Sequence, residues 1–216
     1  MLFRSPGLAA VGAAGAVLLT LAVARAGGQR EPSTLVLAGV VVSSLLGAAT
    51  SLWLLRQSDS LRAVVSWSLG NLGQGSWPAL TVVAAGWAVG AGLLWSQARQ
   101  LDALQLGEAT ARSLGVQTDR LLMWVVAGTS IATAAAVSQA GLIGFVGLVA
   151  PHLCRQVGLT QHRWLLPGAA LVGALLLVLA DLGARVVWRP AELPVGVVTT
   201  LLGGPFFLWL LRSRAR

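Results

Sequence analysis

The residues best suited to metal binding or nucleophilic catalysis lie in one stretch, and they are His152, Cys154 and His162. No other histidine or cysteine occurs in the sequence. A structural zinc site needs four ligands, and no acidic residue stands beside these three in the sequence. A catalytic cysteine–histidine pair needs a cleft and a third group that orients the base. We therefore expect structural roles at a helix end, with no metal, cofactor or catalytic residue.

Asp181 is the acidic residue that lies well inside an apolar run. Acids inside a membrane are functional candidates, and a proton relay is one interpretation. On a helix, however, Asp181 lies about 26 Å beyond Trp164, near the far membrane surface. Arg185 follows one turn later, at the spacing of an ion pair. The pattern favours a structural Asp181–Arg185 pair over a relay.

The longest polar interruption is residues 97–120, QARQLDALQLGEATARSLGVQTDR. Apolar residues recur in it at helical spacing, and Gly107 and Gly115 can end short helices. Glu108 and Arg112 have the i,i+4 spacing of an ion pair. The segment predicts a pair of short amphipathic helices, at about 100–116, that lies along the membrane surface and offers a docking surface.

The composition is that of a membrane protein. The 216 residues are 56% hydrophobic and 10% charged, with a mean hydropathy of +0.79, whereas soluble domains are about a quarter charged. The net charge of +8 is spread over single arginines between apolar runs, which argues against a nucleic-acid-binding patch. The sequence has no lysine, and a P-loop ATPase needs one. We therefore expect any ATP hydrolysis to come from another polypeptide.

Charge-free intervals predict an all-α membrane protein with one domain, residues 1–216, because a bilayer core needs about 20 apolar residues of helix. We expect a short helix at 61–70 and seven spans, at 8–25, 34–55, 77–96, 120–138, 142–157, 164–186 and 193–211. Ten of the fifteen arginines then lie on the side of the C-terminus. The positive-inside rule places that side in the cytoplasm.

Small residues within these spans predict close helix packing. Gly86 and Gly90 are four residues apart, as on a packing face within one bundle. Gly141, Gly144 and Gly147 stand at every third position, from just before to just inside the start of the interval 142–157. We expect these three to be packing positions in a short span.

Several long stretches together resemble one family. These stretches are LVLAGVVVSSLLGAATSL, WSLGNLGQGSW, LDALQLGEATARSLGV, GLIGFVGLVAPHLCRQVGLTQHRWLLPGAALVGALLLVLADLGAR and ELPVGVVTTLLGGPFFLWLL. They resemble, in order, the permeases of FecCD-type ABC importers for vitamin B12, ferric siderophores and haem, and most closely the vitamin B12 branch. The resemblance covers essentially the whole chain.

The resemblance implies a subunit of ten spans in the bacterial inner membrane, and the seven spans expected here match spans four to ten. It implies a second permease copy (as a homodimer or a paired permease), ATP-binding subunits in the cytoplasm, and a periplasmic or lipid-anchored substrate-binding protein. The segment matching the family's ATPase-coupling helices contributes Leu106, Gly107, Glu108, Ala111 and Arg112. Arg185 matches an outward-facing arginine that pairs with glutamates of the binding protein.

The same comparison implies that the first three spans are missing. A truncated product, a mis-assigned start or one half of a split permease would each account for this. Two other functions stay open at this point. One is a proton-coupled secondary transporter that uses Asp181, and the other is a truncated remnant that does not transport.

Overall fold

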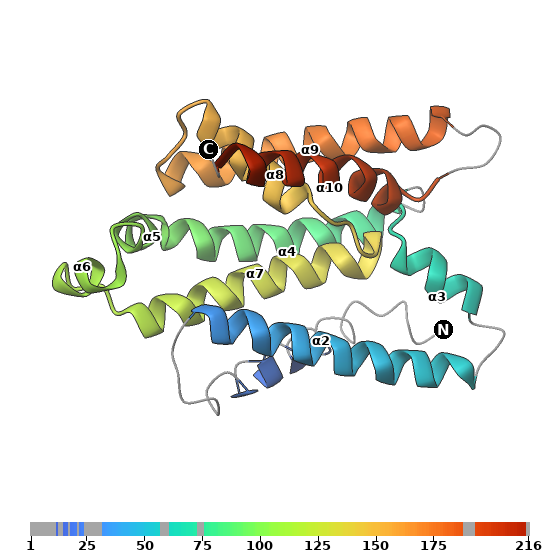
Figure 1. The fold of residues 1–216 in the computed structure, drawn as a ribbon, viewed down its shortest axis with the longest axis horizontal. Coiled ribbons are helices and arrows are strands. Elements are labelled where there is room, and N and C mark those ends of the chain that lie inside the picture. Colours follow the sequence, from blue (N-terminus) through green and yellow to red (C-terminus); the bar gives the residue numbers. More distant parts are fainter. Residues whose placement is uncertain are drawn as a thin grey trace. The chain divides into compact units, whose positions relative to one another are not determined.

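The computed structural model describes residues 12, 15, 16, 18–20, 22, 23, 32–56, 61–72, 76–187 and 193–214. Within these residues every regular element is a helix (Figure 1), which confirms the all-α prediction. The elements are α2 (Pro32–Leu55), α3 (Leu61–Ser68), α4 (Trp77–Ser96), α5 (Ala98–Leu104), α6 (Glu108–Ser113), α7 (Thr118–Ala140), α8 (Val146–Gln156), α9 (His162–Val187) and α10 (Val195–Arg214). The chain forms two compact units, residues 1–65 and 66–216. The first unit holds α2, and the second holds α4 to α10.

Four helices are long and apolar enough to cross a membrane. They are Leu37–Leu55, Trp77–Ser96, Thr118–Ala140 and His162–Val186, and a shorter apolar helix covers Val195–Leu208. At 1.5 Å per residue, these four each reach roughly the thickness of a hydrocarbon core. The predicted short helix at 61–70 is present as α3. The predicted span at 8–25 lies largely outside the described residues.

The span expected at 142–157 needs correction. Its helix, α8, has only 11 residues, which is about 16 Å and half of a bilayer core. Residues 141–145 precede it without helical structure, and Phe145 has a positive φ of 66°. The unbroken apolar composition concealed this interruption, because hydropathy does not report backbone conformation. Of the three glycines, Gly147 has open space around it and is not a packing position.

The second unit is built around the close pair α4 and α7. A Cβ added at Gly86 would clash with Ala135, and one added at Gly90 would clash with the carbonyl of Gly128. These glycines let the two backbones approach, as the Gly86-xxx-Gly90 pattern predicted. Ser76 caps the start of α4, because its hydroxyl accepts from the N–H of Ala79 at 3.4 Å.

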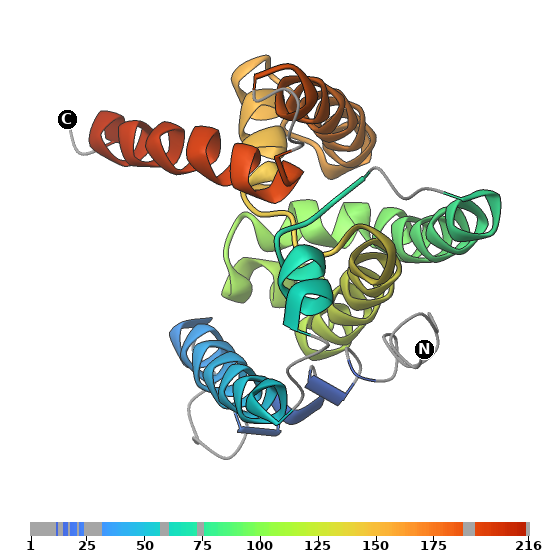
Figure 2. The same ribbon diagram turned by 90° about the vertical axis from the view of Figure 1, so that its right-hand side faces the viewer.

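Three backbone segments meet at the opposite end of this unit from α5 and α6 (Figure 2). A Cβ at Gly141 would lie closer than 3.0 Å to the carbonyl oxygen of Trp67, and one at Gly196 would lie as close to that of Leu69. Gly70 and Gly141 also have φ values of 71° and 73°, a region that side-chain-bearing residues rarely adopt. Gly141 is therefore a point of close backbone approach, which refines its predicted packing role.

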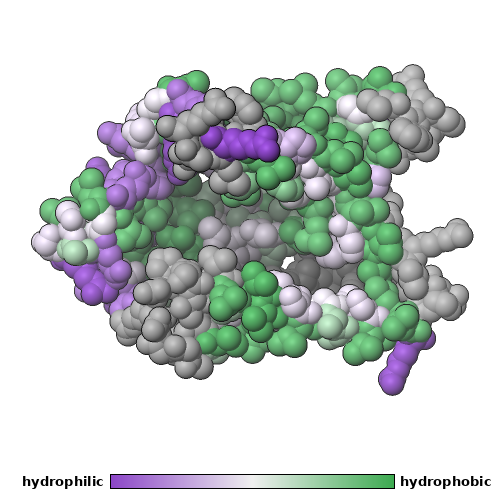
Figure 3. Space-filling model, viewed as in Figure 1, coloured by the Kyte–Doolittle hydropathy of each residue, from purple (hydrophilic) through white to green (hydrophobic). Residues whose placement is uncertain are grey.

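The surface of the second unit has a hydrophilic end and hydrophobic flanks (Figure 3). Hydrophilic residues gather at the end that carries α5 and α6, and the flanks of the long helices are largely hydrophobic. On α9 the exposed positions Leu171, Val178 and Leu182 follow one helical face, with exposures of 75%, 64% and 57%. A face this apolar is suited to lipid rather than water.

Candidate functional site

The predicted surface helices exist and stand between two long helices. A single residue, Gln97, separates α4 from α5, and residues 105–107 separate α5 from α6. Gly107 and Gly115 have φ values of 103° and 83°. Such values are easily reached by glycine and costly for other residues, so these glycines fix the two turns. The prediction of two short helices is confirmed, with Gly107 directly before α6 and Gly115 two residues after its last residue.

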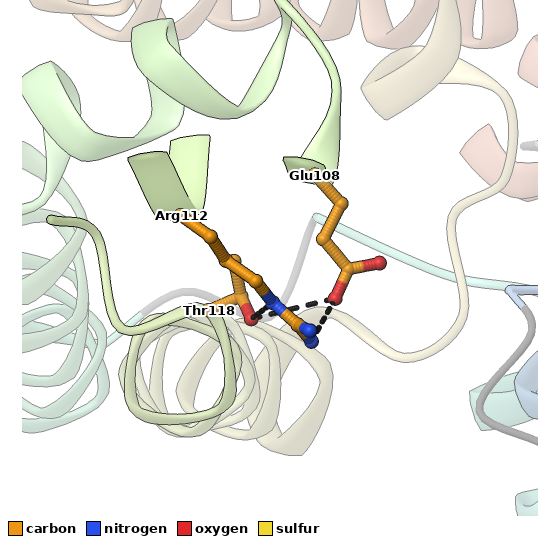
Figure 4. A network of polar contacts seen from close by, with 3 residues as sticks. All are labelled: Glu108, Arg112 and Thr118. Carbon is orange, nitrogen blue, oxygen red and sulfur yellow. Dashed lines mark hydrogen bonds and ion pairs between the residues drawn. The ribbon is translucent and has the colours of Figure 1, made fainter. Parts of the chain in front are cut away.

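Glu108, Arg112 and Thr118 form a polar network that joins α6 to the first residue of α7 (Figure 4). The Nη2 of Arg112 donates to Oε1 of Glu108 at 2.5 Å, and its Nε donates to Oγ1 of Thr118 at 3.3 Å. The Thr118 hydroxyl donates to the same Glu108 oxygen at 3.4 Å. The predicted i,i+4 pair is confirmed, and its side chains are more than half exposed. An exposed ion pair adds little stability to the fold. Because both side chains are exposed, a partner protein can reach both charges.

The five candidate coupling residues fall into two groups. Leu106, Gly107, Glu108 and Arg112 are exposed, whereas Ala111 is fully buried. Ala111 therefore anchors α6, and the exposed residues of the turn form the outer surface. The side chains of Leu106 and Leu114 are 67% and 62% exposed. Sequence reasoning did not select Leu114 as a site residue, although it directly follows α6 and exposes an apolar side chain.

Asp102 of α5 binds the start of α9. Its Oδ1 accepts from the backbone N–H of His162 at 2.8 Å and lies 2.7 Å from the Nδ1 of the same residue. A carboxylate only accepts, so Nδ1 is the donor. The amide nitrogen of Gln105 lies 3.1 Å from the same ring nitrogen. The side chain of His162 is 15% exposed and that of Asp102 is 34% exposed.

This contact corrects the expectation that no acid accompanies the histidines. The partner lies 60 residues earlier in the chain, and spacing within 141–163 gives no signal of it. A carboxylate at a helix start satisfies an otherwise unpaired N–H and complements the positive end of the helix. Asp102 therefore acts as the cap of α9 from a different helix.

His152 and Cys154 stand apart from this contact. The Nε2 of His152 lies 3.0 Å from the Nε2 of Gln156, and its ring packs edge-on against Phe206 at 6.3 Å. Cys154 is buried, with 2% exposure. In the part of the chain that the structure describes, no three His, Cys, Asp or Glu side chains are arranged to hold a metal ion. The three residues thus occupy packing and helix-end positions.

Arg185 and Asp181 lie near the other end of α9. The Nε of Arg185 donates to Oδ2 of Asp181 at 2.7 Å, as the spacing predicted. The Arg185 side chain is 46% exposed and that of Asp181 is 24% exposed. Both side chains of this ion pair are therefore accessible at the surface of α9.

Known proteins resemble this chain in amino-acid sequence. The sequence profile of the FecCD transport family matches residues 1–213. The chain belongs to the FecCD transport family. Two curated relatives support this. The hemin transport system permease protein of Yersinia pestis is 46% identical over 189 residues, which are 87% of this chain and 57% of that protein. The cobalamin import system permease protein of Halobacterium salinarum is 42% identical over 203 residues, 94% of this chain and 54% of that protein.

The fold of this chain is also similar to that of a solved ABC transporter. A solved structure, described as an inward-facing conformation of a transporter assigned to the metal-chelate ABC type, superposes with a TM-score of 0.77 at 28% identity. The superposition covers 98% of this chain and 78% of the solved chain. By contrast, this chain spans little more than half the length of the two curated relatives named above.

Proposed function

We propose that this chain is the membrane-spanning permease subunit of an ABC importer for cobalamin, haem or a ferric siderophore. The observation that carries the proposal is the exposed α5–α6 turn between two close-packed long helices, in a chain of the FecCD family. The relatives named as hemin and cobalamin permeases support the substrate class. The permease makes no covalent change to its substrate, and hydrolysis of ATP belongs to partner subunits.

In this proposal the α5–α6 turn is the contact with the ATPase. Leu106 offers an exposed apolar contact, and Glu108 and Arg112 offer two exposed charges of opposite sign. Gly107 keeps the turn narrow, and the buried Ala111 ties its motion to the bundle. ATP binding and hydrolysis would displace this turn and switch the bundle between outward-open and inward-open states.

The contact between Asp102 and His162 supports a route for that displacement. A rigid α5 that holds the first residue of α9 pulls on the whole helix when it moves. Arg185 lies 23 residues further along the same helix, which is about 35 Å at 1.5 Å per residue. One continuous helix, α9, therefore connects the proposed ATPase contact with the far membrane surface, where Arg185 would meet a periplasmic or lipid-anchored binding protein.

The remaining expectations are part of the same proposal. The chain contributes to a single transmembrane permease domain in the bacterial inner membrane, with the C-terminus and the α5–α6 turn in the cytoplasm. A second permease copy completes the pathway. The excess of arginines on that side supports the orientation. The proton-coupled alternative has weaker support, because Asp181 is already paired with Arg185.

The test is reconstitution of this chain with candidate ATPase and substrate-binding subunits of a FecCD-type importer. We expect the ATPase to bind the chain and Glu108→Arg to weaken that binding roughly tenfold, as loss of a contact worth about 1.4 kcal/mol does. Arg212→Glu is the matched control, because it reverses one exposed charge on the same side but outside the turn. Equal ATPase affinity of the Glu108 variant and the unmodified chain would refute the coupling role.

A further inference from the structure

Residues of α4, α5 and α9, helices of the second unit that Figure 1 shows, line one open cavity. Its volume is about 480 Å³, and it is lined by Gly92, Trp95, Ser96, Ala98, Arg99 and Arg163. The proposed coupling residues do not line it. Two of its six lining residues are arginines, and they come from helices that are far apart in sequence. The tertiary fold therefore brings two cations to one opening.

Neither arginine has its charge neutralised by a neighbour. Within the described part of the chain, neither Arg99 nor Arg163 takes part in an ion pair. The guanidinium of Arg163 stands over the ring of Trp164, 5.9 Å from its centroid, an arrangement that leaves its N–H edge free for hydrogen bonds. The acid on α5, Asp102, is engaged by His162. Two cations that line one cavity favour an anion inside it.

The cavity lies at the level where lipid headgroups begin. The apolar span of α4 ends at Ser96, and that of α9 begins at His162. Arg99 and Arg163 are thus within one helical turn of these ends. Trp95 and Trp164 are 57% and 60% exposed at the same level. Exposed tryptophans mark the interface between hydrocarbon and water.

We propose that this cavity binds the phosphate group of an anionic phospholipid from the surrounding leaflet. Arg99 and Arg163 donate to the phosphate oxygens, for which the planar guanidinium is well shaped. The glycerol and acyl chains leave along the exposed wall formed by Gly92 and Trp95. That apolar wall favours a lipid over free phosphate, and the position at the end of two spans favours a lipid over an acidic protein segment. Basic pockets between spans at a membrane surface bind such headgroups.

The purified full chain, stripped of lipid in detergent, provides the test. Native mass spectrometry measures retention of phosphatidylglycerol against phosphatidylcholine. We expect phosphatidylglycerol to bind at least about tenfold more tightly. The double substitution Arg99→Gln with Arg163→Gln should remove this preference. The control Arg120→Gln with Arg155→Gln removes the same charge from two other exposed arginines and should keep it.

A second variant leaves both charges in place. Gly92→Leu fills the cavity, and a Cβ at this position meets nothing within 4 Å, so the helix tolerates it. We expect loss of phosphatidylglycerol preference, whereas Gly47→Leu, also at an open position, should retain it. The proposal is overturned by equal binding of the two lipids, by an equal loss in the arginine control, or by displacement of the lipid with inorganic phosphate. It is also overturned if only an acidic segment of the ATPase protects Arg99 and Arg163 from chemical modification. None of these outcomes depends on transport.

Discussion

Asp102 accepts hydrogen bonds from both the backbone N–H and the imidazole of His162, the first residue of α9. This contact makes α5 the cap of a helix that begins 60 residues later. This joint connects the proposed ATPase contact to the longest helix of the second unit.

Replacing Asp102 with alanine should uncouple α5 from α9. The N–H of His162 then loses its acceptor, and loss of a helix cap costs about 0.5–2 kcal/mol. We expect a lower unfolding temperature in detergent and a loss of ATP-driven uptake in the assembled importer. Ser76→Ala is the control, because it removes the cap of α4 (Ser76 to Ala79, 3.4 Å) without touching the joint. A joint of purely structural importance would lower uptake equally in both variants.

The charges of the α5–α6 turn can be tested by exchange. Glu108→Arg alone should weaken ATPase binding, because it puts two positive charges beside each other and removes the acid. Combining it with Arg112→Glu restores the internal pair with reversed order. If Glu108 contacts the ATPase directly, the double variant should fold as well as the unmodified chain but bind the ATPase roughly tenfold more weakly. Full recovery of ATPase binding would show that the pair serves only to hold the turn.

The backbone crossing at Gly141 should not tolerate a side chain. Its φ is 73°, and a Cβ there would clash with the carbonyl of Trp67. We expect Gly141→Ala to lower the yield of folded protein by size-exclusion chromatography in detergent. Gly147→Ala, at an open helical position, should be neutral or slightly stabilising, since alanine favours helix by up to about 1 kcal/mol over glycine. Equal yields from the two variants would contradict the close approach.

The role of Arg185 predicts a change in binding-protein affinity. Arg185→Glu should weaken docking of the substrate-binding protein, measured by surface plasmon resonance against the reconstituted importer. Changing the partner glutamate to arginine should restore it. Asp181→Asn is the control, because it keeps the arginine and removes its acceptor carboxylate, so docking should persist. Unchanged affinity of the Arg185 variant would exclude the docking role.

The proton-coupled alternative makes the opposite prediction about energy supply. The carboxylate of Asp181 already accepts a hydrogen bond from Arg185 at 2.7 Å, which is a structural use of this acid. We expect vesicles containing this chain alone to take up no substrate under an imposed pH gradient. Uptake that requires a gradient, needs no ATPase and disappears in Asp181→Asn would support the alternative.

The sequence alone determined the features that depend on composition and local spacing. Apolar runs of about 20 residues predicted helices α2, α4, α7 and α9, because lipid requires every backbone group to be paired within the helix. The i,i+4 spacing predicted the Glu108–Arg112 and Asp181–Arg185 pairs, since helix geometry alone brings such residues together. Gly107 and Gly115 predicted the two turns for the same local reason.

Tertiary structure decided what lies between distant segments. Asp102 contacts His162, and Arg99 and Arg163 line one cavity. Both arrangements bring together residues about 60 positions apart, and no local periodicity encodes which helices become neighbours. The shortening of the span at 142–157 to α8 also arises from tertiary contact. Gly141 approaches a backbone carbonyl from another segment, and this crossing interrupts the helix within an apolar run. Local rules determine helices and turns, whereas long-range packing determines which charged groups share a site.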